Sequence, residues 1–252
     1  MHLALVPLAL AVGLLVGGVG VGGVVLPPAL TWLFGMTPHD AAGTSMWSFL
    51  FTCAVGTIVY GRSPAMDRRM TGLLALGAAP AAVAGALANG VLPGEIALVP
   101  LGVFTLVTGV WHLCFRARAE RRRAEEGAAR PRMGALAAVS LGVFIGFCSA
   151  ITGTGGPVLL IPILLIIGIP AVTAVAAAQL VSLPLVLCAT AGYAVQGGID
   201  YGMGTLIGAL AAVGALLGAR LALRMPQRVL HRVTAGVLVG IGALVLANAA
   251  LG

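Results

Sequence analysis

Charged residues are scarce in this chain. Only 8% of its 252 residues are charged, whereas about a quarter of the residues of an ordinary soluble domain carry charge. Lysine is absent, so all 14 basic residues are arginine. Because 60% of the residues are hydrophobic, the composition excludes an ordinary soluble domain.

The side chains that build catalytic and metal sites are also scarce. Four cysteines stand alone in apolar sequence, at Cys53, Cys114, Cys148 and Cys188, so neither a disulfide framework nor a zinc site is predicted. No Ser/His/Asp, paired-carboxylate or metal-ligand constellation falls within the apolar stretches. We therefore expect no enzyme, no catalytic residues, no metal and no cofactor.

Long apolar stretches recur from residue 3 to residue 250. Most are long enough for a membrane-spanning helix, which needs about 20 residues. The 37 glycines suit helices that pack closely in lipid, and the alternating pattern of about 10 residues typical of barrel strands does not occur. The sequence predicts an all-α polytopic membrane protein whose surroundings are the lipid bilayer.

The arginines form three clusters, at 62–69, 116–132 and 220–232. Basic clusters beside apolar spans mark the cytoplasmic side of a membrane. Nucleic-acid binding needs a basic face on a folded domain, and no such domain is predicted. Nucleic acid is therefore not an expected partner.

The chain matches itself at one constant offset of 133 residues. Tyr60 meets Tyr193, Asp67 meets Asp200, and the glycine pattern GxGG occurs at 20–23 and again at 153–156. We predict two copies of one membrane unit, at 1–115 and 134–252, joined by an Arg-rich cytoplasmic connector at 116–133. Both aspartates precede a predicted helix and are expected to cap it.

The arginine clusters do not repeat. The loop at 62–69 maps onto 195–202, which has no arginine, and the segment at 220–232 maps onto 87–99, which also has none. Equivalent loops therefore carry opposite topology signals, which indicates two inverted-topology repeats, as in many secondary transporters.

Each half is then expected to contain a Gly-broken helical hairpin followed by three transmembrane helices, giving 8–10 membrane segments in all. The three spans of the first half are expected near 40–60, 70–91 and 95–115. A single kinked helix in place of each hairpin is the alternative; it would make the halves parallel and leave 220–232 outside.

The segment from Thr152 to Pro157, Thr-Gly-Thr-Gly-Gly-Pro, carries the strongest chemical signal. Glycine disfavours a helix and proline suits the first turn of a new one, so this segment is expected to be unwound. Free N–H groups at the start of a helix form a natural anion site. The copy at 20–23 is expected to share this backbone but lacks the threonines and the proline. Close packing of helices is the alternative role of both glycine patterns.

Few other polar residues lie inside the spans. The predicted substrate-binding residues comprise the two glycine breaks, their threonines and three polar neighbours: Gly20, Gly22, Gly23, Thr44, Ser45, Thr152, Gly153, Thr154, Gly155, Gly156 and Gln179. No acidic or basic residue stands deep in a span, so a buried carboxylate relay for protons is not expected. His39, near the outer end of a span, stands alone and is not expected to be catalytic.

The chain resembles the sulfite exporter TauE/SafE family of bacterial membrane transporters. The resemblance rests on the two GxGG patterns with prolines after them, on Ala42-Gly-Thr-Ser-Met46, on Gln196-Gly-Gly-Ile-Asp-Tyr201 and on the segment 214–226. It covers nearly the whole chain outside the connector. It implies export of small anions, notably sulfite and organosulfonates, across the bacterial inner membrane. At 177–179 the chain has Ala-Ala-Gln where the family pattern suggests a Thr-Ser pair, so a symmetric polar site is in doubt.

These observations lead to the hypothesis of a secondary transporter that moves a small sulfur-containing anion by alternating access. A proton or another cation is the expected coupling ion, and a homo-oligomer is one option for the assembly. The alternatives are a passive anion channel of the same fold and a structural subunit whose glycines serve packing alone.

Overall fold

The computed structural model describes residues 5–20, 22–62, 67–91 and 133–226, together with isolated positions between 106 and 243. In this part every regular element is a helix, so the prediction of an all-α protein is confirmed. The elements are α1 (Leu5–Val19), η2 (Gly22–Val24), α2 (Leu26–Phe34), α3 (Pro38–Tyr60), α4 (Arg68–Asn89), α7 (Ala135–Thr152), α8 (Pro157–Ile167), α9 (Ala171–Gln196) and α10 (Tyr201–Arg224).

Five of the described helices are long and apolar enough to cross a membrane, namely α3, α4, α7, α9 and α10. The spans expected near 40–60 and 70–91 correspond to α3 and α4. The expected span near 95–115 and the connector at 116–133 lie almost entirely outside the described residues, as does the last span of the second half. The described helices support a multi-pass membrane protein.

Local sequence explains where several of these helices begin. The carboxylate of Asp67 accepts the N–H of Met70 at 3.0 Å, and that of Asp200 accepts the N–H of Met203 at 2.9 Å. Both aspartates are therefore N-caps, as the sequence predicts. Helix α3 begins after Thr37, whose hydroxyl accepts the N–H of Asp40.

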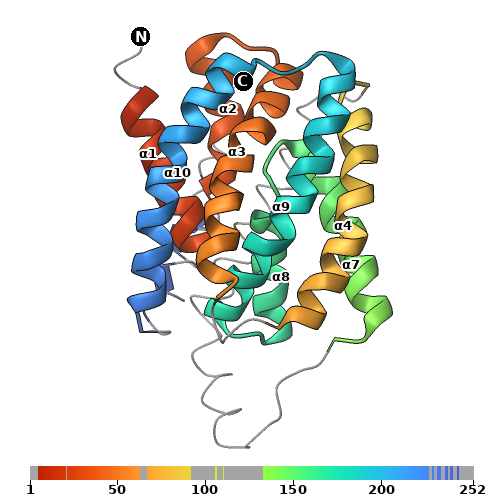
Figure 1. Ribbon diagram of the computed structural model, residues 1–252, viewed down its shortest axis with the longest axis vertical. Coiled ribbons are helices and arrows are strands. Elements are labelled where there is room, and N and C mark those ends of the chain that lie inside the picture. The colour runs from red at the N-terminus through yellow and green to blue at the C-terminus, as the bar shows by residue number, and fades with distance from the viewer. Residues whose placement is uncertain are drawn as a thin grey trace, which may run out of the picture.

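Two helices occupy the opening segment of each half. In Figure 1, α1 descends from the end of the bundle that holds the N-terminus, and α2 returns to that end before α3 begins. In the second half, α7 rises from the opposite end and α8 returns to it before α9. Each opening segment is thus a pair of helices rather than one kinked helix, and in the second half the first of the pair, α7, is itself long enough to span a membrane.

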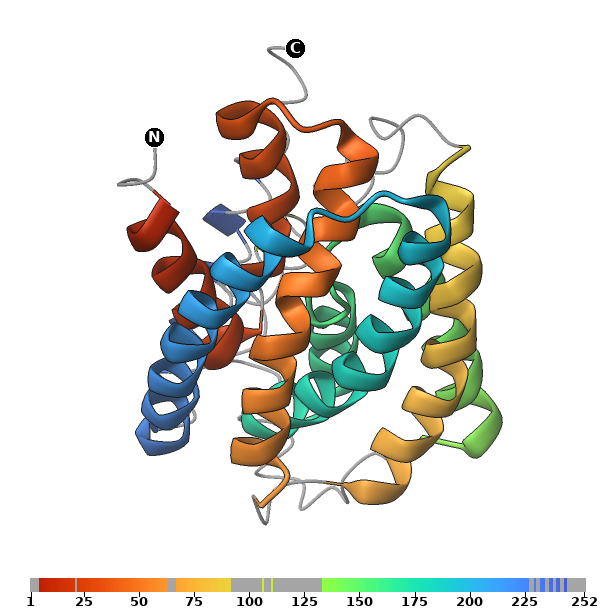
Figure 2. The same cartoon turned by 45° about the horizontal axis from the view of Figure 1, so that its top comes forward.

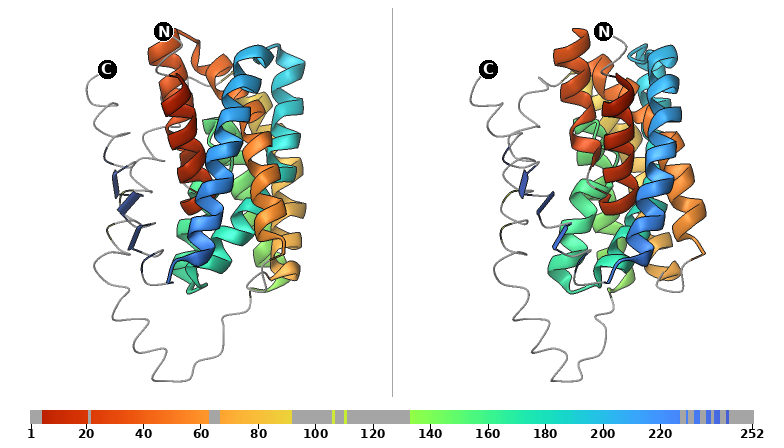
Figure 3. Two further views of the ribbon diagram at one scale, coloured as in Figure 1. Left: turned by 60° about the vertical axis from the view of Figure 1, so that its left-hand side comes forward. Right: turned by 90° about the vertical axis from the view of Figure 1, so that its left-hand side faces the viewer.

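Small residues pack the first helix of each half against a long helix of the other half, α1 against α10 and α7 against α4. A Cβ atom at Gly13 of α1 would fall on the carbonyl of Ala211 in α10, and one at Gly146 of α7 on the carbonyl of Ala78 in α4. These two contacts are related by the 133-residue offset. Figure 3 shows α1 lying along α10 on one side of the bundle.

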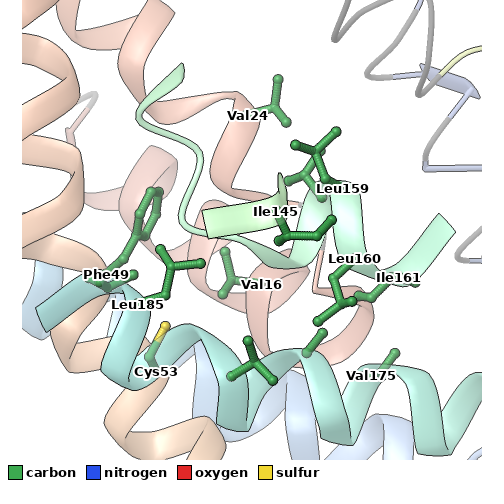
Figure 4. Close-up of a cluster of buried hydrophobic side chains, with 14 of the residues drawn as sticks. Val16, Val24, Phe49, Cys53, Ile145, Leu159, Leu160, Ile161, Val175 and Leu185 are labelled. Atoms are coloured by element: carbon green, nitrogen blue, oxygen red, sulfur yellow. The ribbon is translucent and has the colours of Figure 1, made fainter. Parts of the chain in front are cut away.

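The helices α3 and α9, which correspond to one another in the repeat, run antiparallel through the centre (Figure 2). Gly43 near the start of α3 meets Gly198 beyond the end of α9, whereas Gly56 near the end of α3 meets Gln179 early in α9. Around these two helices, a buried apolar cluster fills the space beside α1, α7 and α8. It includes Val16, Phe49, Ile145, Leu160 and Leu185 (Figure 4).

Candidate anion site at the two helix breaks

The break between α7 and α8 is a left-handed glycine turn. Gly153, Gly155 and Gly156 have φ angles of 69°, 80° and 102°, values that side chains rarely tolerate. Helix α8 then starts at Pro157, whose missing N–H costs nothing in a first turn. The unwound segment expected from the sequence is therefore present, and its three glycines are required by the backbone.

The break between α1 and α2 has a different backbone. Gly20 has a φ of 78°, but Gly22 and Gly23 lie in the short 3-10 helix η2. The expectation that both breaks share one conformation is wrong. The next helix in this half, α2, begins at Leu26 with Pro27 in its first turn. Its proline therefore stands four residues after Gly23, whereas Pro157 directly follows Gly156.

The two breaks lie against each other in the interior. A Cβ atom at Gly20 would be 3.3 Å from the Cβ of Pro157, and one at Gly23 would fall on the carbonyl of Thr154. Phe49 of α3 contacts both breaks, since Cβ atoms at Gly23 and Gly155 would lie 3.4 and 2.9 Å from its ring. The structure thus brings together two glycine-rich segments that correspond at the 133-residue offset.

Side chains cap the carbonyl ends of both half-helices. The hydroxyl of Tyr60 donates to the carbonyl of Gly17 at 2.8 Å, and that of Tyr193 donates to the carbonyl of Ala150 at 2.7 Å. These two bonds are equivalent in the repeat. They neutralise the acceptor ends of α1 and α7, where a helix otherwise presents unpaired carbonyls.

An amide side chain from the other half completes each cap. Gln179 of α9 donates through Nε2 to the carbonyl of Val16 in α1. Asn89 of α4 donates through Nδ2 to the carbonyl of Ile151 in α7, at 2.6 Å. Each carbonyl end is therefore held by one tyrosine of its own half and one amide of the opposite half.

The amino end of α8 has the opposite character. Within the described part of the chain, the N–H groups of Gly155 and Gly156 find no acceptor. The first turn of α8 adds the positive end of its helix dipole, equivalent to about half a unit charge. Because the carbonyls are capped and these N–H groups are not, the break offers donors to a ligand, which suits an anion.

Two buried hydroxyls lie on the helices next to this break. Ser45 is 0% exposed, and its Oγ has no partner in the described residues. It lies on the face of α3 that carries Ala42 and Phe49, both of which contact the break at 153–155. The Oγ of Ser149 on α7 is also buried and unpaired.

The remaining predicted polar residues are engaged in the fold. Thr152 and Thr154 bond to each other through hydroxyls 2.9 Å apart. Thr44 accepts the N–H of Asp200 at 3.0 Å and so joins α3 to the start of α10, away from the breaks. Gln179 lies beside the first break, but its Nε2 serves as a cap; its Oε1 is buried without a partner.

Several residues that shape the site are missed by the sequence argument: Phe49, Tyr60, Asn89, Ser149 and Tyr193. The tyrosines carry a signal, because they repeat at the 133-residue offset. Asn89 carries a weaker one, as a polar residue at the end of an apolar span.

Apolar spanning helices around two facing helix breaks define a polytopic membrane protein of the kind that moves solutes through its interior. The sequence model of the family described as Sulfite exporter TauE/SafE matches residues 4–245, so the chain belongs to this family. Membership of this family implies that the chain transports a small anion across a membrane. No curated protein and no solved structure matches the chain.

Proposed function

We propose that this protein is a secondary carrier that exports a small sulfur-containing anion, such as sulfite or an organosulfonate, across the bacterial inner membrane. The anion binds beside the start of α8, at the N–H groups of Gly155 and Gly156. The observation that carries the proposal is the polarity of the break, whose acceptors are capped while these donors are free.

The energetics of the site favour one small anion. Burying an ion costs several kcal/mol, and a hydrogen bond to a charged group contributes about 1.5–3 kcal/mol. Two glycine N–H groups and the Ser45 hydroxyl together contribute about 5–9 kcal/mol on that scale. This is enough to offset the desolvation of one small ion without a cationic side chain.

The basic ends of the helices support the proposed orientation. The start of α10 at Gly204 contacts Trp47 of α3, and Gly208 contacts Phe51 further along, so α3 and α10 run in the same direction. The arginines that follow α3 and those that end α10 therefore lie at one end of the bundle. The positive-inside rule assigns this end to the cytoplasm.

The antiparallel course of α3 and α9 supports an inverted repeat, with the chain divided at 1–115, 116–133 and 134–252. In an alternating-access cycle, we infer that the tightly packed pairs α1–α10 and α4–α7 move as rigid units. The breaks between them change exposure from one side of the membrane to the other.

Transport into proteoliposomes of labelled sulfite and of labelled methanesulfonate tests this function. We expect saturable uptake that accelerates when the vesicles are preloaded with unlabelled anion. Gly155→Ala places a Cβ 2.9 Å from the Phe49 ring at a φ of 80° and should lower uptake at least tenfold. Gly72→Ala is the matched control, because its Cβ meets no atom within 4 Å.

Ser45→Ala gives a second variant for the case in which Gly155→Ala does not fold. It removes an unpaired hydroxyl and leaves the packing in place, so the protein should melt like the wild type while its apparent affinity falls about tenfold. Flux that is linear in concentration and shows no counterflow would identify a passive channel instead. Unchanged uptake in both variants would show that the anion does not bind at this break.

A further inference from the structure

A chain of hydrogen bonds joins a histidine at one end of the bundle to the broken helix α7. The Nδ1 of His39, in the first turn of α3, lies 2.7 Å from the Oδ1 of Asn89, the last residue of α4. The Nδ2 of Asn89 in turn donates to the carbonyl of Ile151. His39 is partly exposed, whereas Asn89 is 7% exposed. A titratable ring is therefore two hydrogen bonds from the backbone that precedes the break.

The direction of these bonds assigns the hydrogens. Because the Nδ2 of Asn89 donates to Ile151, its Oδ1 is the acceptor, and the Nδ1 of His39 must carry a hydrogen. The other ring nitrogen, Nε2, is then the atom that gains or loses a proton. Protonation leaves the chain intact and makes its first bond charge-assisted, which also polarises the amide toward Ile151.

This chain of hydrogen bonds occurs at the break between α7 and α8 and has no counterpart at the break between α1 and α2. At the offset of 133 residues, His39 corresponds to Val172 and Asn89 to Ala222, neither of which can form such a bond. In the opposite half the amide that caps α1 is Gln179, which comes from the middle of the bundle. A proton at His39 therefore acts on α7 and leaves α1 unaffected.

We propose that His39 binds a proton from the side of the membrane opposite the basic loops, and that Asn89 transmits its charge to α7. In this proposal His39 is a proton-binding residue and Asn89 a positioning residue. The charged chain holds the end of α7 to α4 more tightly and so slows the rearrangement of the break during transport. The effect on flux rests on the proposed function, whereas the hydrogen-bond chain itself does not.

The titratable groups near His39 have other partners. On α3, the carboxylate of Asp40 bonds to the Thr37 hydroxyl at 2.7 Å. On α9, the ring of Tyr193 lies 5.3 Å from that of His39, but its hydroxyl donates to Ala150. At the start of α10, the carboxylate of Asp200 caps Met203.

The two helices joined by these hydrogen bonds, α4 and α7, place few titratable groups near His39. Described α4 ends in the uncharged Asn89, and its arginines stand at its opposite end. The nearest titratable residue along α7 is the thiol of Cys148. Within the described residues, His39 is thus the titratable group that bonds to Asn89.

Flux measured at different outer pH values tests the proposal. Methanesulfonate is a suitable probe because it keeps a single charge throughout the range in which histidine titrates, about pH 5 to 8. In vesicles of one orientation with the inner pH fixed, we expect flux to fall about threefold to tenfold as the outer pH falls. His39→Gln keeps a donor for Asn89 but cannot titrate, so its flux should not change with outer pH.

Two further variants test whether the pH response depends on the hydrogen bonds through Asn89 or on a neighbouring titratable group. Asp40→Asn, the matched control in the same helical turn, should keep the wild-type pH profile. Asn89→Leu should abolish it even though His39 is present. A pH response that survives in either His39→Gln or Asn89→Leu would overturn the proposal.

Hydrogen–deuterium exchange of the segment 149–157 gives a readout that does not depend on transport. Wild type and His39→Gln are compared at the same pH, so that the intrinsic exchange chemistry is equal. We expect stronger protection in the wild type at about pH 5.5 and no difference at about pH 8. If this result appears without any flux, the proton chain stands and the carrier proposal fails. Equal protection of wild type and His39→Gln at both pH values would show that His39 does not act on α7.

Discussion

The two capping tyrosines give the sharpest quantitative test of the structure. Tyr60→Phe and Tyr193→Phe each remove one buried hydrogen bond, of 2.8 and 2.7 Å, and leave the ring in place. Such a bond contributes about 0.5–1.5 kcal/mol in proteins, and about 0.6 kcal/mol on average between membrane helices. We expect each variant to lose about 1 kcal/mol of stability, or about 2–4 °C in melting temperature for a chain of this size.

Thermal unfolding in detergent, followed by tryptophan fluorescence, measures this loss. The third tyrosine of the chain, Tyr201, is the control; it is 49% exposed, and no hydrogen bond of its hydroxyl is present in the described residues. Tyr201→Phe should melt with the wild type. The reasoning is refuted if Tyr201→Phe loses as much as the other two, or if neither capping tyrosine matters.

Two further predictions concern the packing and the orientation of the halves. Gly13→Ala and Gly146→Ala each push a methyl group onto a backbone carbonyl of the facing helix and should cost about 1–3 kcal/mol in an unfolding titration; tolerance equal to that of Gly72→Ala would contradict the packing. Single cysteines introduced at positions 64 and 227 of a cysteine-free protein should react with an impermeant maleimide from the same side of the membrane. Labelling from opposite sides would refute the inverted repeat.

The sequence predicts the helical elements well because local rules determine them. Asp67 and Asp200 stand where a cap is needed, and both are caps. The run of glycines before Pro157 can hardly continue a helix, and the helix stops there. Apolar stretches of sufficient length become spanning helices. In each case the signal and the structure lie within a few residues of each other.

The roles of single polar residues depend on distant contacts and are harder to predict. Gln179 reaches a carbonyl 163 residues away, and Thr44 reaches an N–H 156 residues away. Both partners are backbone groups, so their side chains give no sign of these bonds in the sequence. The first break differs from the second because Gly22 and Gly23 enter a 3-10 turn, and both glycines are closely packed against neighbouring backbone atoms.

The exchange of partners between the halves determines how the molecule holds together. The first helix of each half rests on a long helix of the other, α1 on α10 and α7 on α4, so neither half can cover its own glycine face. A half on its own would present a backbone groove to lipid and would need a second copy of itself, running the other way, to fill it. The duplicated chain supplies that second copy in one polypeptide. A bulky substitution at Ala211 of α10 should therefore displace α1 at Gly13 and disturb the break that follows it.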